Sequence, residues 1–112
     1  MQHSNLSAEA WGRLDRDQQI LSIAAEMHRA GKRLRSGDSS GFRLAYERVL
    51  NLTELTVELR AERALRRELL LWRDCVAELY LQAAPSLAEH SGVFRALLML
   101  VPAGYAQLPY LL

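Results

Sequence analysis

The fold of this chain is decided by residues 40–83, which read SGFRLAYERVLNLTELTVELRAERALRRELLLWRDCVAELYLQA. No proline occurs in this stretch, and no glycine follows Gly41, so local signals alone would allow one long helix. The hydrophobic phase argues against that. Successive helical residues turn by about 100°, which places the apolar stripe of residues 65–83 about 170° away from that of residues 42–59. A reversal near residues 60–62 turns both stripes onto one core, so we predict a helical hairpin.

Capping signals mark two further helices. Ser86 and Glu89 have capping-box spacing directly after Pro85, and Asp15 and Gln18 repeat that spacing near the start of the chain. Ser7 is a second candidate cap there, and a bend at Gly12 could separate the two. Pro102 and Gly104 stop the last helix.

These signals predict an all-α protein. We expect a single domain over residues 1–112, folded as an antiparallel up-and-down four-helix bundle with an apolar, irregular C-terminal tail. The predicted helices cover residues 8–34, 40–59, 62–83 and 87–101. Trp72 lies in the middle of its apolar stripe and should be buried, whereas Trp11, near a fraying end, should matter less.

Composition narrows the function classes. The chain has 112 residues, 50% of them hydrophobic and 24% charged, with a formal net charge of +1. Those values are typical of a globular protein and give no strong overall field toward nucleic acid or anionic lipid. The apolar stretch of residues 93–101 contains Arg95 and is too short to cross a bilayer, so we expect no membrane partner.

The single cysteine, Cys75, cannot form an internal disulfide, which fits a reducing compartment. Residues 1–7 are polar and show no secretory signal, so we expect a cytoplasmic protein. Cys75 lies at the edge of an apolar stripe, between Trp72 and Leu79, and we interpret it as a packing residue rather than a nucleophile.

No catalytic, cofactor or metal signature is visible. The histidines His3, His28 and His90 lie in different segments, and none has the spacing to Glu or to a second His that di-iron bundles and zinc proteases use. We therefore expect no enzyme activity, cofactor or metal. A positive charge at His90 would oppose the dipole of the last helix, so we predict a neutral, structural histidine there.

The predicted helix over residues 40–59 is apolar around most of its circumference, and the tail is apolar as well. A four-helix bundle buries only one stripe of each helix, so it cannot cover both of these apolar surfaces. We therefore predict a protein–protein interaction module, in the first place a homodimer. A partner protein helix is another possible occupant. The candidate interaction surface comprises Leu44, Leu50, Leu55, Val57, Tyr105, Leu108, Tyr110 and Leu111.

An alternative role depends on an arginine cluster near the start of the third helix, which comprises Arg60, Arg63, Arg66 and Arg67. Arginine suits phosphate, so RNA or nucleoprotein binding is the runner-up hypothesis. Glu58, Glu62 and Glu68 are interleaved at spacings that allow ion pairs, and no aromatic residue stands among the arginines to stack on a base. Solvated ion pairs are the simpler interpretation, and nucleic acid is the less favoured partner.

Residues 35–50 place Gly37 and Asp38 before a helix carrying Tyr46, Glu47 and Arg48. This segment resembles the second helix of small bacterial helical chaperones of the flagellar export type. The resemblance covers one helix and implies a small chaperone or adaptor that binds a partner helix. Toxin-associated helical bundles that cut RNA use an Arg and a His four to six residues apart. No histidine in this chain has such an Arg before it, and this difference counts against an RNase function.

Overall fold

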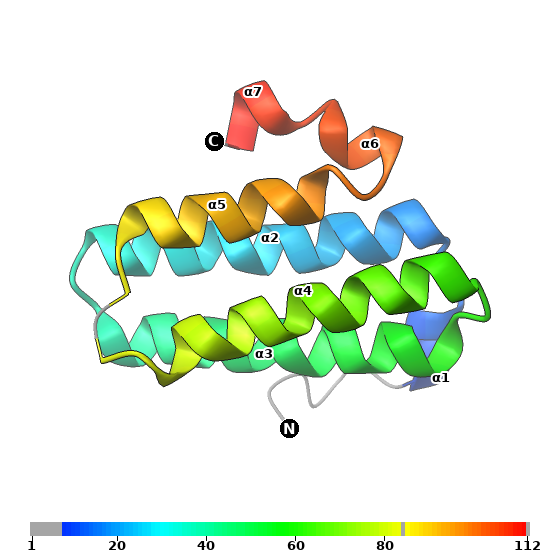
Figure 1. The fold of residues 1–112 in the computed structure, drawn as a ribbon, viewed down its shortest axis with the longest axis horizontal. Helices are drawn as coiled ribbons and strands as arrows, with labels where there is room; N and C mark the ends of the chain where they lie inside the picture. Colours follow the sequence, from blue (N-terminus) through cyan, green and yellow to red (C-terminus); the bar gives the residue numbers. More distant parts are fainter. Residues whose placement is uncertain (1–7, 84, 112) are drawn as a thin grey trace.

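The computed structural model describes residues 8–83 and 85–111, and over those residues it contains helices and no strand (Figure 1). The fold is therefore all-helical, as predicted. The helices are α1 (Ala8–Gly12), α2 (Arg16–Arg35), α3 (Ser39–Leu59), α4 (Arg63–Leu81), α5 (Leu87–Leu98), α6 (Pro102–Tyr105) and α7 (Leu108–Leu111).

Four long helices, α2 to α5, build the body of the molecule. α2 packs against α3 and α5, and α4 packs against the same two helices, so the four enclose one core. Figure 1 shows the chain reversing direction from each of these helices to the next. The core contains fully buried apolar side chains from all four, among them Ile23, Tyr46, Leu69 and Leu97.

The hairpin lies where the hydrophobic phase predicts it. α3 ends at Leu59, Arg60 adopts an extended backbone conformation, and α4 begins at Arg63. No glycine or proline enforces this turn. The Arg60 side chain helps hold it, because its Nε donates to Gln19 Oε1 and its Nη2 donates to the Leu14 carbonyl, both at 2.9 Å.

Both predicted capping boxes are present. Ser86 Oγ accepts from the Glu89 N–H, and the Ser86 N–H donates back to the Glu89 carboxylate. That second bond holds the pKa of Glu89 below its usual value. Asp15 and Gln18 exchange the same two bonds at the start of α2. The expected cap at Ser7, the whole of residues 1–7 and Leu112 lie outside the described residues.

The first predicted helix, residues 8–34, is in fact two helices. α1 ends at Gly12, and the Asp15 capping box starts α2 at Arg16, so the expected bend separates two elements. α1 packs against α3, where the Trp11 indole N–H donates to Thr56 Oγ1 at 2.9 Å. Trp11 is 2% exposed, so it is at least as buried as Trp72 at 6%, and its burial gives no support to the expectation that it matters less. Trp72 is buried as predicted.

The last predicted helix also ends early, and the tail is not irregular. α5 stops at Leu98 rather than at residue 101, and the chain then forms the short helices α6 and α7. A Cβ at Gly104 would lie 2.5 Å from the Leu98 carbonyl oxygen, so the absence of a side chain lets α6 fold closely against the end of α5. Val101 is buried at this junction.

Candidate interaction site

Most of the predicted α3 surface is covered within the chain. Leu44 is 43% exposed, Leu50 and Leu55 are half-buried against the core, and Val57 is buried. The cover comes from α2 and α4 and, at the C-terminal end of α3, from α1. The apolar surplus of α3 is thus largely covered by other helices of the same chain, and Leu44 is the residue of this set that stays open.

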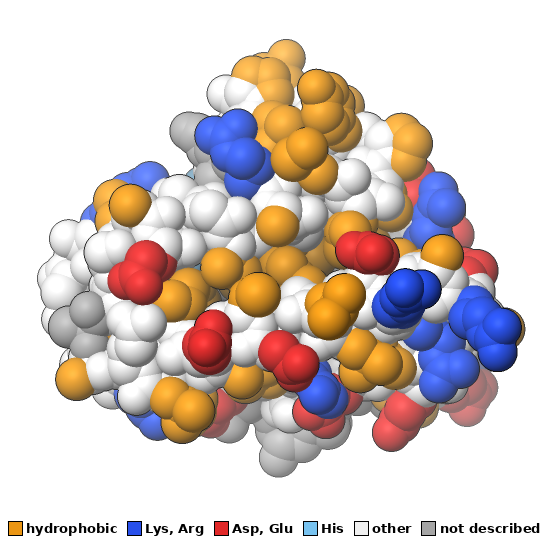
Figure 2. Space-filling model, viewed as in Figure 1, with side chains coloured by type: hydrophobic (Ala, Val, Ile, Leu, Met, Phe, Trp, Pro, Cys, Tyr) orange, Lys and Arg blue, Asp and Glu red, His pale blue; other side chains and the backbone are white. Residues whose placement is uncertain are grey.

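The tail docks in part. Leu108 and Leu111 are half-buried and pack on the core, whereas Tyr105 and Tyr110 are 60% and 79% exposed. Figure 2 shows hydrophobic side chains gathered over α6 and α7 at the top of the molecule. The candidate residues of the tail therefore divide into two that pack and two that face outward.

A further exposed apolar site lies on α4 and was not predicted. Leu69, Trp72, Val76 and Leu79 face the core, and the opposite side of the helix presents Leu70 and Leu71. Leu71 is 58% exposed. The sequence did contain a signal, because three consecutive leucines at residues 69–71 cannot all lie on one helix face.

The four arginines of the cluster have two different environments. Arg60 is held by the α1–α2 junction, where its side chain is 21% exposed and makes the two hydrogen bonds given above. Arg63, Arg66 and Arg67 are exposed, and within residues 8–83 and 85–111 none of their side chains forms a hydrogen bond or ion pair. Of the ion pairs expected for this cluster, the described residues show that of Arg60 with Glu62, at 3.4 Å, and none for the other three arginines. Figure 2 shows basic side chains gathered at the end of the molecule where α4 begins.

Arg60→Ala should lower the free energy of unfolding by about 1 to 2 kcal/mol, because it leaves the buried Gln19 amide oxygen and the Leu14 carbonyl without this donor. Arg63→Ala, three residues further along and at an exposed position, should change it by less than about 0.5 kcal/mol. Urea denaturation of both variants measures the difference. Equal values for the two would contradict a structural role for Arg60.

His90 is the most unusual polar group of the core. It is 2% exposed, and its Nε2 lies 3.0 Å from the Met27 carbonyl oxygen. A carbonyl only accepts, so Nε2 carries the proton and Nδ1 accepts from the Tyr46 hydroxyl at 2.7 Å. Burial lowers the pKa of His90 to about 4 and raises that of Tyr46. His90 is thus the neutral, structural residue that its position in α5 predicts.

Gly31 allows that arrangement, since a Cβ there would lie 3.0 Å from His90 Nε2. Gly31→Ala should lower the free energy of unfolding by about 1 to 2 kcal/mol, despite the better helix propensity of alanine. The histidine is held at both ring nitrogens and has no room to withdraw. Gly92→Ala is the matched control, because nothing lies within 4 Å of a Cβ there, and it should stabilise the protein. Thermal melts that move in the same direction for both would count against the close packing of Gly31 on His90.

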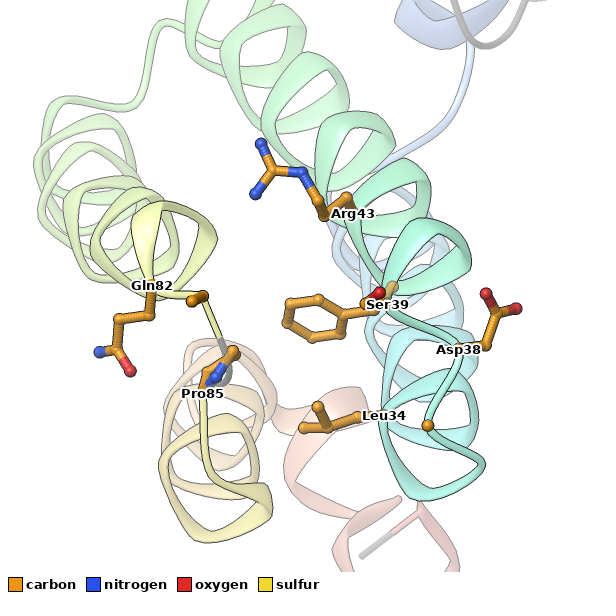
Figure 3. A pocket seen from close by; sticks show the side chains of 9 residues that line it. Leu34, Asp38, Ser39, Arg43, Gln82 and Pro85 are labelled. Carbon is orange, nitrogen blue, oxygen red and sulfur yellow. The ribbon is translucent and has the colours of Figure 1, made fainter.

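A pocket of about 230 Å³ lies where the α2–α3 loop meets the end of α4. Figure 3 shows Leu34 and Pro85 facing each other across it, with the Asp38 and Gln82 side chains directed away. Asp38 accepts from the Gly41 N–H as the cap of α3, and Arg43, on the same helix, donates to the Tyr80 carbonyl. The polar groups around this pocket are thus already used in holding the helix ends together.

Other candidate chemistry is sparse over the described residues. Cys75 is exposed and is not the packing residue that its sequence position suggests. Within residues 8–83 and 85–111, no three His, Cys, Asp or Glu side chains are grouped to hold a metal ion. Over the same part of the chain, no helix combines the length and hydrophobicity needed to cross a membrane. No protein-family model matches the chain, and neither a curated protein nor a solved structure is significantly similar to it.

Proposed function

We propose that the protein is a non-catalytic protein–protein interaction module, an antiparallel four-helix bundle whose role is to self-associate as a homodimer in the cytoplasm. The observation that carries this proposal is the pair Leu70 and Leu71, which stand side by side on the outside of α4, 37% and 58% exposed. Two adjacent exposed apolar side chains with charged residues on both sides fit the apolar centre and polar rim of a contact surface.

Tyr105 and Tyr110 provide supporting evidence. Tyrosine is enriched at protein interfaces because it offers a large apolar ring with a polar end, and both rings are mostly exposed here. A homodimer is the first expectation because two-fold pairing is the commonest arrangement of soluble oligomers.

Light scattering over about 10 to 300 μM protein tests the proposal, a range suited to dissociation constants in the micromolar range. The mass should rise with concentration toward twice that of one chain. A mass of one chain at every concentration would contradict self-association.

A second candidate function is RNA binding through Arg63, Arg66 and Arg67, favoured by their freedom from ion pairs among the described residues. Salt separates the two functions. Phosphate binding weakens steeply between about 50 and 200 mM salt, more steeply than association through leucines flanked by a few charge pairs. Fluorescence anisotropy with a labelled single-stranded RNA at both salt concentrations is the measurement. Tight binding at low salt that is lost at high salt would favour the RNA function.

A further inference from the structure

The outward face of α4 has an ordered charge pattern. Opposite the core side chains, the helix presents in turn two basic, two apolar and two acidic residues, all exposed. They are Arg63, Arg67, Leu70, Leu71, Asp74 and Glu78. We refer to these six residues as the α4 stripe. Its N-terminal half is positive, its centre is apolar and its C-terminal half is negative.

This pattern is complementary to itself when reversed. Arg67 stands three residues before Leu70, and Asp74 stands three residues after Leu71. Arg63 and Glu78 stand seven residues outside the same pair. Two antiparallel copies related by a two-fold axis between Leu70 and Leu71 would therefore place each arginine level with an acidic residue of the second copy.

Nucleic acids and acidic peptides fit the stripe less well than a second copy does. A nucleic acid would meet Asp74 and Glu78 with like charge, and an acidic peptide would do the same at the C-terminal half. Asp74 contacts the neighbouring Arg73 at 3.2 Å, but its side chain is 69% exposed and stays open to a second copy. Arg66 lies level with Cys75 of the second copy, so no like charges oppose each other there.

We propose that a second copy of the chain binds here, with the two α4 helices antiparallel and the leucines at the centre. This inference rests on the proposed function of self-association and names its surface. Leu70 and Leu71 also border a shallow hollow of about 330 Å³ that the side chains of the second copy would fill. Because the apolar centre is small, we expect a dissociation constant in the micromolar range that rises with salt.

Charge exchange is the sharpest test, with dimerisation followed by sedimentation equilibrium. Arg67→Glu and Asp74→Arg each oppose like charges at two symmetry-related sites, so each alone should weaken dimerisation about tenfold or more. The double variant restores opposite charges between the copies and should return the dissociation constant to within about threefold of the original. Glu58→Arg, an exposed charge reversal on α3, is the control and should have no effect.

Leucine replacement and cross-linking test the centre of the stripe. Leu71→Glu should abolish the dimer, whereas Leu44→Glu, an equally simple change on exposed α3 surface, should not. In a Cys75→Ser background, Leu70→Cys should form a disulfide-linked dimer under mild oxidation. Residue 70 lies next to the two-fold axis, so the two copies of this residue are only one helical rise, about 1.5 Å, apart along the helix direction. Leu44→Cys in the same background should not.

Circular dichroism melts show whether each variant is still folded. Every variant is at an exposed position, so each should keep the melting temperature of the original protein. A monomer at all concentrations would overturn both this inference and the proposed function. A different set of results would overturn the α4 pairing and leave self-association intact. In that case the α4 substitutions would not change the dissociation constant, the double variant would not differ from the single ones, and Tyr110→Ser would dissociate the dimer.

Discussion

Trp72→Ala is expected to lower the free energy of unfolding by about 3 to 5 kcal/mol, a large part of the stability of a domain this size. The indole is 6% exposed, and its N–H donates to the Val93 carbonyl at 2.8 Å, which ties α4 to α5. The substitution leaves a cavity and removes the donor of that bond. Urea denaturation followed by circular dichroism is the measurement.

Two controls separate volume from hydrogen bonding at this site. Trp72→Phe keeps most of the ring and loses the N–H, so it should cost about 1 to 2 kcal/mol. Leu81→Ala, on the same helix but 80% exposed, should be near neutral. A Trp72→Ala variant as stable as Leu81→Ala would place Trp72 outside the core.

Stability should fall between pH 6.5 and pH 4 because of His90. Burial lowers its pKa from 6.5 to about 4, and the nearby Arg35 acts in the same direction. The unfolded chain therefore takes up a proton near pH 6.5 that the folded chain resists until about pH 4. The contribution of His90 to the free energy of unfolding is fully present above pH 6.5. It is lost as the pH falls toward 4, by up to about 3 kcal/mol.

His90→Gln provides the control for this pH dependence. Glutamine does not titrate, so the variant should be less stable than the original protein at pH 7 but should lose less stability between pH 6.5 and pH 4.5. Denaturation curves at half-unit pH steps give both slopes. Parallel curves for the two proteins would mean that His90 is not the titrating group.

Local signals predicted the parts of this fold that depend on neighbouring residues. The Ser86 and Asp15 capping boxes form because each needs only a side chain and a backbone group three residues apart. The turn at Arg60 was predictable without glycine or proline, because two helical faces pointing in opposite directions cannot share one core.

Contacts between distant segments were not predictable in the same way. Nothing near Trp11 indicates that its partner is Thr56, and without that contact α3 appeared to have an uncovered apolar flank. The same reason explains the missed pair of His90 and Tyr46, which come from α5 and α3. Counting apolar residues on a helix predicts that something covers them, but it does not distinguish a short helix of the same chain from a second subunit.

The separation of α1 from its docking site has a consequence for the order of events during folding. Trp11 and Leu14 emerge from the ribosome long before their partners Thr56 and Arg60, which lie more than forty residues later. A five-residue helix is not stable alone, so α1 has to wait until the α3–α4 turn exists. We therefore expect Trp11→Ala to accelerate unfolding and to leave the refolding rate almost unchanged, which marks α1 as a segment that closes after the rest of the bundle has assembled.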